Sequence, residues 1–192
     1  LKRQLLAGGI GLGLLVLALK LGTRRVSALA YPLLGVAFVL LLLVLIPGIG
    51  RMAGGARRWI DLGILRFQPS EAAKVALVLY LARSLSRKQE RVQLFTIGFL
   101  PHALVTGLMA ALVLAERDLG TVVIMGLVLF TMLFTAGVRL RYLLGAVVLL
   151  APAFWYLVAS TPSRLQRFLA YLDPWGHRDG AGFQLVESLL GI

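Results

Sequence analysis

The chain of 192 residues is both apolar and basic, with 59% hydrophobic residues, a mean hydropathy of +0.90 and a formal net charge of +12. This composition is typical of a polytopic membrane protein. The lack of cysteine excludes disulfides and thiolate metal sites, and two histidines are too few for a zinc or haem site unless carboxylates complete it. The basic residues form short clusters between apolar runs, which favours anionic lipid headgroups over nucleic acid as their partner.

Apolar segments along the chain predict an all-α fold, a polytopic transmembrane helical bundle with about six spans. Residue 70 opens the weakest segment, which is short and carries Lys74. We expect Ser70, after Pro69, to cap this helix and Glu71 to lie at the positive end of its dipole. One integral membrane domain over residues 1–192 is the simplest organisation. The predicted spans are residues 5–19, 28–46, 70–85, 94–115, 121–137 and 143–159.

Loop charges predict which side of the membrane each connection faces. Three short connections, within residues 20–25, 83–91 and 139–141, hold nine cations and one acid. Dense positive charge in short loops marks the cytoplasmic side. Loops 47–69 and 160–192 then face outward, and they carry both signs of charge, as a reaction centre for a charged lipid requires. Because the chain starts with Leu-Lys-Arg-Gln and ends within an apolar run, we expect it to be incomplete at both ends.

Residues 55–74, GARRWIDLGILRFQPSEAAK, are the first place to look for function. They place four cations, two acids, a Trp, a Gln and a Pro between two long apolar segments. A loop with only a structural role would not require this combination of charged and polar residues. A second polar segment, Glu-Arg-Asp-Leu-Gly at 116–120, separates two further predicted spans.

Four motifs in this order resemble the SEDS family of peptidoglycan glycosyltransferases, whose members include FtsW and RodA. They are GARRWIDLG with FQPSEAAK, DLGT after a long apolar helix, RLQRFLAYLDPW, and GAGFQLVESL. The segments LKRQLL, IPGIG and AGVRLRYLLG resemble FtsW more than RodA. The chain departs from the family at Glu116-Arg117, where Gln-Pro or Glu-Pro usually precedes DLGT.

The resemblance implies an enzyme that polymerises lipid II into glycan strands on the outer face of the cytoplasmic (inner) membrane, as a multi-pass protein. It also implies lipid II, membrane lipids and a class B penicillin-binding protein (transpeptidase) as partners. In this reaction a sugar hydroxyl attacks the anomeric carbon of a lipid-linked donor. A carboxylate must take the hydroxyl proton, and fixed positive charge must stabilise the departing diphosphate.

The resemblance places the carboxylate that acts as general base, an Asp, beyond Ile192. Residues 1–192 alone are therefore expected to be inactive. A divalent cation, Mg or Mn, at the diphosphate also fits this chemistry.

The cations of the first motif are predicted to bind substrate. Arg57, Arg58 and Arg66 are suited to grip a diphosphate through forked hydrogen bonds, and the alternative is ordinary headgroup contact. Trp59 favours an interfacial anchor over a platform for a sugar. Gln68 is expected to shape the start of the following helix as well as to face the substrate.

Lys74 is the predicted catalytic residue of this segment, with Glu71 in support. Helical spacing places the two on one face. Since an ionisable pair inside an apolar span indicates function, we expect Lys74 to hold and polarise the later Asp. The alternative is a local ion pair with Lys74 extended toward the interface. Asp118 is expected either to cap the next helix at Thr121 or to organise the outward cavity, where it would contact substrate.

Arg164 and Arg167, three residues apart in the last loop, are predicted to contact a diphosphate or headgroup, with interfacial anchoring as the equal alternative. Two other functions stay open. A lipid II transporter (flippase) also uses broken helices and charged cavities, although no convincing internal repeat supports it. A non-catalytic scaffold of a cell-wall synthesis complex is the third reading.

The topology prediction is testable by cysteine labelling. Single cysteines at Gly54 and Gln89 should react with a membrane-impermeant thiol reagent from opposite sides of the membrane, because one lies in a predicted outward loop and the other in a basic short loop. Reaction of both from the same side would contradict the assignment.

Overall fold

The computed structural model describes residues 2–53, 56–61, 63, 66–177, 180 and 182–191. Gly54, chosen above for labelling, lies outside these residues. The chain divides into two compact units, residues 1–142 and 143–192, which are considered separately.

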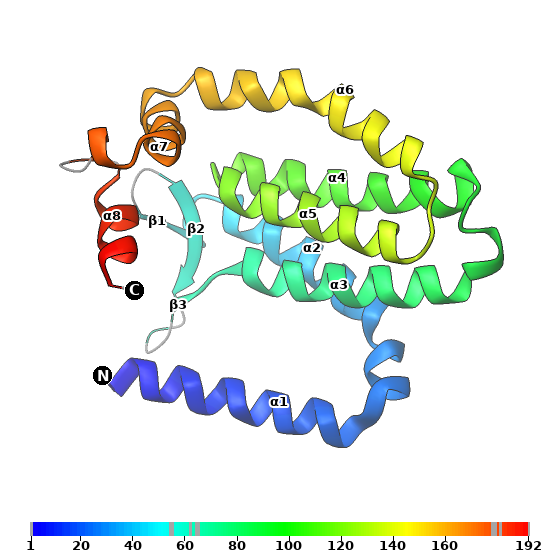
Figure 1. Ribbon diagram of the computed structural model, residues 1–192. Helices are drawn as coiled ribbons and strands as arrows, with labels where there is room; N and C mark the ends of the chain where they lie inside the picture. Colours follow the sequence, from blue (N-terminus) through cyan, green and yellow to red (C-terminus); the bar gives the residue numbers. More distant parts are fainter. Residues whose placement is uncertain are drawn as a thin grey trace. The chain divides into compact units, whose positions relative to one another are not determined.

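Helices dominate the first unit. It contains α1 (Lys2–Ala28), α2 (Ala30–Leu45), α3 (Pro69–Arg87), α4 (Leu100–Ala115) and α5 (Leu119–Thr135). Figure 1 shows α2, α3, α4 and α5 running side by side. One turn of π-helix, Phe95–Phe99, leads directly into α4. The buried core between the helices is built from Ala30, Leu41, Ala73, Leu77, Leu81, Met109, Val113, Met125 and Leu133.

Each apolar segment predicted from the sequence forms a helix, so the helical fold is confirmed. Among the described residues, Phe95–Ala115 and Leu140–Ala159 are long and apolar enough to cross a membrane individually. Gly8–Ala28 and Ala30–Leu45 meet that standard only together and are bent by 86° at the break between them. The apolar helix Leu119–Thr135 is shorter. The number of six spans therefore stays a prediction.

A small sheet occupies the predicted outward loop 47–69, which the all-α expectation did not include. Strands β1 (Gly50–Ala53), β2 (Ala56–Asp61) and β3 (Arg66–Phe67) form an antiparallel sheet in the order β1-β2-β3. Polar residues between apolar runs were interpreted as a loop because the strands are too short to show a clear alternating pattern. The sheet lies at the end of the helices where α3 begins (Figure 1).

The start of α3 differs from the prediction. Gln68, in an extended conformation, is the residue before the helix, and Pro69 is the first helical residue, so Ser70 is not the N-cap. Proline suits this position because its fixed φ is already helical and it has no N–H to leave unpaired. Glu71 does lie in the first turn, as expected.

A buried polar contact ties α3 to α4. The His102 ring is fully buried and contacts the Gly98 carbonyl oxygen through Nδ1 at 2.7 Å and the Ser84 hydroxyl through Nε2 at 2.9 Å. With both ring nitrogens paired inside the protein, His102 has a structural role, since buried polar groups must be satisfied.

The second unit contains α6 (Leu140–Ala159) from residue 143 onward, α7 (Pro162–Leu172), a 3₁₀ turn at Trp175–His177 and α8 (Phe183–Leu190). Its Trp155 and Phe168 rings meet edge to face with centroids 6.0 Å apart. Arg164 donates from Nη1 to the Leu157 carbonyl oxygen at 3.1 Å, which ties α7 to the end of α6.

Candidate functional site

The turn between α4 and α5, residues 116–118, is held by an arginine from the sheet. Arg58 is the extra residue of a β-bulge in β2, because Trp59 pairs with Arg51 and Arg57 pairs with Met52. Bulges redirect a side chain out of the regular alternation. Arg58 donates from Nη2 to the Arg117 carbonyl oxygen at 2.6 Å and from Nε to that of Glu116 at 3.3 Å.

The turn to which Arg58 donates has an unusual backbone conformation. Arg117 has a φ of +62°, in the left-handed region that residues with a side chain adopt only at a cost of about 1–2 kcal/mol. The orphan carbonyls at the end of α4 point toward the guanidinium, which replaces the partners that a continued helix would supply. The sequence between two apolar helices is thus folded into a tight, charged turn.

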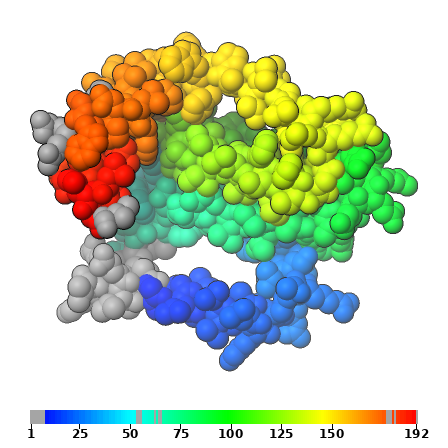
Figure 2. Space-filling view, viewed as in Figure 1, coloured from blue at the N-terminus to red at the C-terminus, as the bar shows by residue number. Residues whose placement is uncertain are grey.

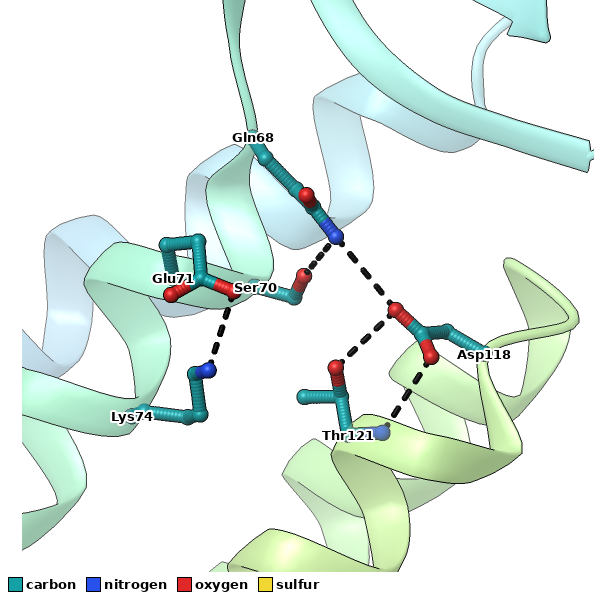
Figure 3. A network of polar contacts seen from close by, with 6 residues as sticks. All are labelled: Gln68, Ser70, Glu71, Lys74, Asp118 and Thr121. Atoms are coloured by element: carbon teal, nitrogen blue, oxygen red, sulfur yellow. Dashed lines mark hydrogen bonds and ion pairs between the residues drawn. The ribbon is translucent and has the colours of Figure 1, made fainter. Parts of the chain in front are cut away.

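Asp118 joins this turn to the start of α3 (Figure 3). Its Oδ1 accepts from the Thr121 backbone N–H at 3.2 Å, and its Oδ2 accepts from the Thr121 hydroxyl at 2.9 Å. Gln68 donates from Nε2 to the same Oδ2 at 3.3 Å and to the Ser70 hydroxyl oxygen at 2.9 Å. The predicted capping role of Asp118 is confirmed, and Gln68 and Asp118, fifty positions apart, are brought together.

Between the first and second turns of α3, Glu71 and Lys74 form an ion pair (Figure 3). The Lys74 Nζ lies 2.9 Å from the Glu71 Oε1, which confirms that they share a face. The Glu71 side chain is 60% exposed and that of Lys74 is 22% exposed. Solvent therefore reaches mainly the Glu71 side of this ion pair, and the Lys74 side chain stays partly exposed beside it.

Glu116 is the most unusual acid of the site. It is 1% exposed, and neither of its carboxyl oxygens has a hydrogen-bond partner among the described residues. The pKa of Glu116 is raised to about 8, first by burial and then by the negative charge of Asp118, while the Arg58 guanidinium opposes the shift. At neutral pH this carboxyl is mainly protonated, which avoids the large cost of burying an unpaired charge.

The other predicted residues of the sheet stay near the surface. Arg57 and Trp59 in β2 are half-buried and Arg66 in β3 is exposed. Across the sheet, Arg51 pairs with Asp61 at 3.1 Å. Arg57, Trp59 and Arg66 therefore reach the surface, whereas the Arg58 guanidinium donates to the carbonyl oxygens of the turn.

Arg164 and Arg167 lie in α7 and belong to the second unit. Arg164 is half-buried and bound to a backbone carbonyl, while Arg167 is exposed. No group of three His, Asp or Glu side chains within the described part of the chain is arranged to hold a metal ion. These described residues therefore offer no such set of side-chain ligands for the divalent cation considered above.

Sequence reasoning missed Glu116 and Ser70 as members of the network. An acid that directly follows sixteen residues of apolar helix was the available signal for Glu116. Its burial depends on packing from several elements, which no local pattern reveals. Ser70 was predicted only as a helix cap. Its hydroxyl oxygen instead accepts a hydrogen bond from the side chain of Gln68, the extended residue before α3.

The pKa of Glu116 predicts a pH-dependent stability. A folded-state pKa near 8 and an ordinary value of 4.5 mean that folding takes up a proton, so stability falls as pH rises through this window. Glu116→Gln should therefore be more stable than the parent at pH 8 by on the order of a few kcal/mol, and the advantage should disappear near pH 5.

Thermal unfolding of the purified protein in detergent across this pH range measures the effect. Glu90→Gln, which alters an exposed acid, is the control and should leave the pH profile unchanged. An equal stability difference at pH 5 and pH 8 would show that Glu116 is not protonated by folding.

Comparisons with known proteins agree with this geometry. The chain matches, over residues 1–192, the family described as "Cell cycle protein", which groups FtsW, RodA and SpoVE. It is 44% identical to the probable peptidoglycan glycosyltransferase FtsW of Geobacter metallireducens, covering all of this chain and 51% of that protein. It is 36% identical to the one of Legionella pneumophila, over 95% of this chain and 46% of that protein.

Solved structures show the same fold. The rod shape determining protein RodA of Thermus thermophilus superposes with a TM-score of 0.67 at 38% identity, covering 79% of this chain and 49% of that one. A chain of a peptidoglycan synthase complex that coordinates polymerization and crosslinking gives a TM-score of 0.75 at 37% identity, with 97% and 55% covered. The chain thus spans about half the length of the relatives it matches. On these grounds, the chain belongs to the FtsW/RodA/SpoVE family of membrane cell cycle proteins.

Proposed function

We propose that this chain is part of a peptidoglycan glycosyltransferase that joins the sugars of lipid II into glycan strands. The observation that carries the proposal is the meeting of two motifs at one end of the bundle: the start of α3, with Lys74, is bound through Gln68 to Asp118 at the start of α5. Similarity along the whole chain to proteins named as such transferases supports it.

The reaction divides its tasks among groups of different charge. A sugar hydroxyl of one chain attacks the anomeric carbon of the lipid-linked donor, the bond to the diphosphate breaks, and the hydroxyl proton passes to a carboxylate. We assign this base to an Asp outside residues 1–192. Arg57 and Arg66, which reach the surface, are suited to stabilise the departing diphosphate.

Lys74 has the second catalytic role in this proposal. Its ammonium holds and polarises the carboxylate that takes the proton, and Glu71 keeps the ammonium in place. A compact charge on a helix is positioned more sharply than one on a loop. The exposure of Glu71 leaves Lys74 able to accept a second anionic partner.

Gln68, Asp118 and Arg58 have a positioning role rather than direct contact with substrate. Their polar atoms are engaged within the protein, and together they fasten the first turn of α3 to the α4–α5 turn. Small displacements of a catalytic group are costly in rate. The network would therefore act through Lys74.

The proposed setting is the outer face of the cytoplasmic membrane, with the sheet and the start of α3 outward. The dense basic loops at the opposite end of α3 support this orientation. A class B penicillin-binding protein is the proposed partner, because a structural relative belongs to a complex that couples polymerization to crosslinking.

Lys74→Met tests the catalytic assignment. Methionine keeps a long, flexible side chain and a similar helix preference but removes the charge. Polymerisation of lipid II by the intact protein should fall about a hundredfold or more, while thermal stability is kept. Lys74→Arg should restore activity only in part, because a planar guanidinium does not replace a compact ammonium.

Lys88→Met is the matched control, since it removes the same charge at the other end of α3, and it should polymerise at the parent rate. A well-folded Lys74→Met protein with parental activity would contradict the assignment. A transporter or a scaffold would form no glycan in this assay, whichever variant is used.

The positioning role predicts a rescue. Gln68→Glu places a second carboxylate beside that of Asp118, and the repulsion between them should lower kcat with little change in KM. Adding Asp118→Asn reverses the hydrogen bond, because the new amide donates to the new carboxylate while its oxygen still caps α5. The double variant should recover most of the lost kcat. Loss confined to KM, or no recovery, would indicate direct contact with substrate instead.

A further inference from the structure

A cavity of about 430 Å³ opens at the end of the first unit that is distant from the site described above. It lies between residues 89–94, which follow α3, and residues 136–139, which follow α5. With 19 residues at about 1.5 Å each, α3 separates it from the start of that helix by about 28 Å. The cavity is thus a separate feature of the molecule.

Each of the two loops around this cavity is anchored by a buried valine side chain. Val92 and Val138 are buried, at 4% and 5% exposure. Gly98 allows the first loop to lie close, because a Cβ at that position would come within 1.7 Å of the Val92 carbonyl oxygen. The cavity walls are therefore held in place before any ligand arrives, which lowers the cost of binding.

The polar lining suits a phosphate with a hydroxylated neighbour. Arg91 and Arg139 contribute two guanidinium groups, and Gln89 and Gln93 contribute amides. Glu90 is the single acid of the lining, so the wall keeps a net positive charge. Guanidinium groups bind phosphate through paired, charge-assisted hydrogen bonds, and a carboxylate accepts from hydroxyl groups.

A partly apolar groove continues from the cavity along the helices. A second hollow of about 220 Å³ shares Gln89 and Ala136 with the first and is otherwise lined by the apolar Ala82, Leu85 and Met132 and by the hydroxyl-bearing Ser86 and Thr135. It lies between α3 and α5, which adjoin on the face shown in Figure 2. A charged pocket that leads into a groove with aliphatic side chains on both helices matches the two parts of a phospholipid.

We propose that this cavity and groove bind one anionic phospholipid, of the phosphatidylglycerol type, with its phosphate at Arg91 and Arg139. One acyl chain lies in the groove between α3 and α5. The glycerol hydroxyls of the headgroup face Glu90 and the neighbouring glutamines. The site is independent of the glycosyltransferase proposal, because it uses none of the residues assigned to that reaction.

Native mass spectrometry of the intact protein, titrated with phosphatidylglycerol, tests the site. The double variant Arg91→Gln/Arg139→Gln should bind this lipid at least about tenfold more weakly than the parent. Ala82→Trp fills the groove and should weaken binding similarly. The controls are Arg87→Gln, which removes one positive charge outside the cavity where the double variant removes two, and Leu104→Trp, a large apolar change at an exposed position of α4; both should bind as the parent does.

Further titrations identify the ligand class. Phosphatidylethanolamine should bind much more weakly than phosphatidylglycerol, and inorganic phosphate should not displace the lipid. Equal binding of the two lipids, or displacement by phosphate, would overturn the proposal. So would weakening by Arg87→Gln to the extent seen with the double variant, or unchanged binding by Ala82→Trp.

Discussion

The contact of Arg58 with the carbonyl oxygens of Glu116 and Arg117 is the interaction on which the rest of the site depends. It closes the turn between two apolar helices and holds Arg117 in a left-handed conformation that the local sequence does not favour. The helix α5 can then start at Leu119, directly after Asp118, whose carboxylate caps it. Because a guanidinium carries several donors in a rigid plane, one side chain is able to satisfy two orphan carbonyls at once.

Asp118 extends this arrangement to α3. One carboxylate accepts from the first turn of α5 and from Gln68, which precedes the first turn of α3, so it lies at the positive ends of two helix dipoles. The neighbouring Glu116 carboxyl is buried with no hydrogen-bond partner among the described residues, and its raised pKa keeps it mainly protonated at neutral pH. The protonated Glu116 thus adds no negative charge to the turn.

The proposed chemistry follows from how this frame presents Lys74. Its ammonium is paired with an exposed acid and stands one helical turn from the clamped residues. A charge so placed is both oriented and reachable, which a role in polarising a carboxylate requires. At the other end of α3, Arg91 and Arg139 line a cavity whose shape and charge favour a lipid. One helix therefore separates the proposed catalytic and lipid-binding ends of the unit.

The sequence by itself determined the helices, the family and several local contacts. Long apolar runs have few alternatives to a helix. The spacing of Glu71 and Lys74 predicts their contact, and Asp118 caps α5 by accepting from the backbone N–H three positions later. Only the tertiary structure decided the small sheet, the part played by Arg58, the bond between Gln68 and Asp118, and the burial of Glu116. The bonds of Arg58 and Gln68 join residues fifty or more positions apart, and the burial of Glu116 depends on packing from several elements, so neither leaves a periodic signal in the chain. The strands are local but too short to show a clear alternating pattern.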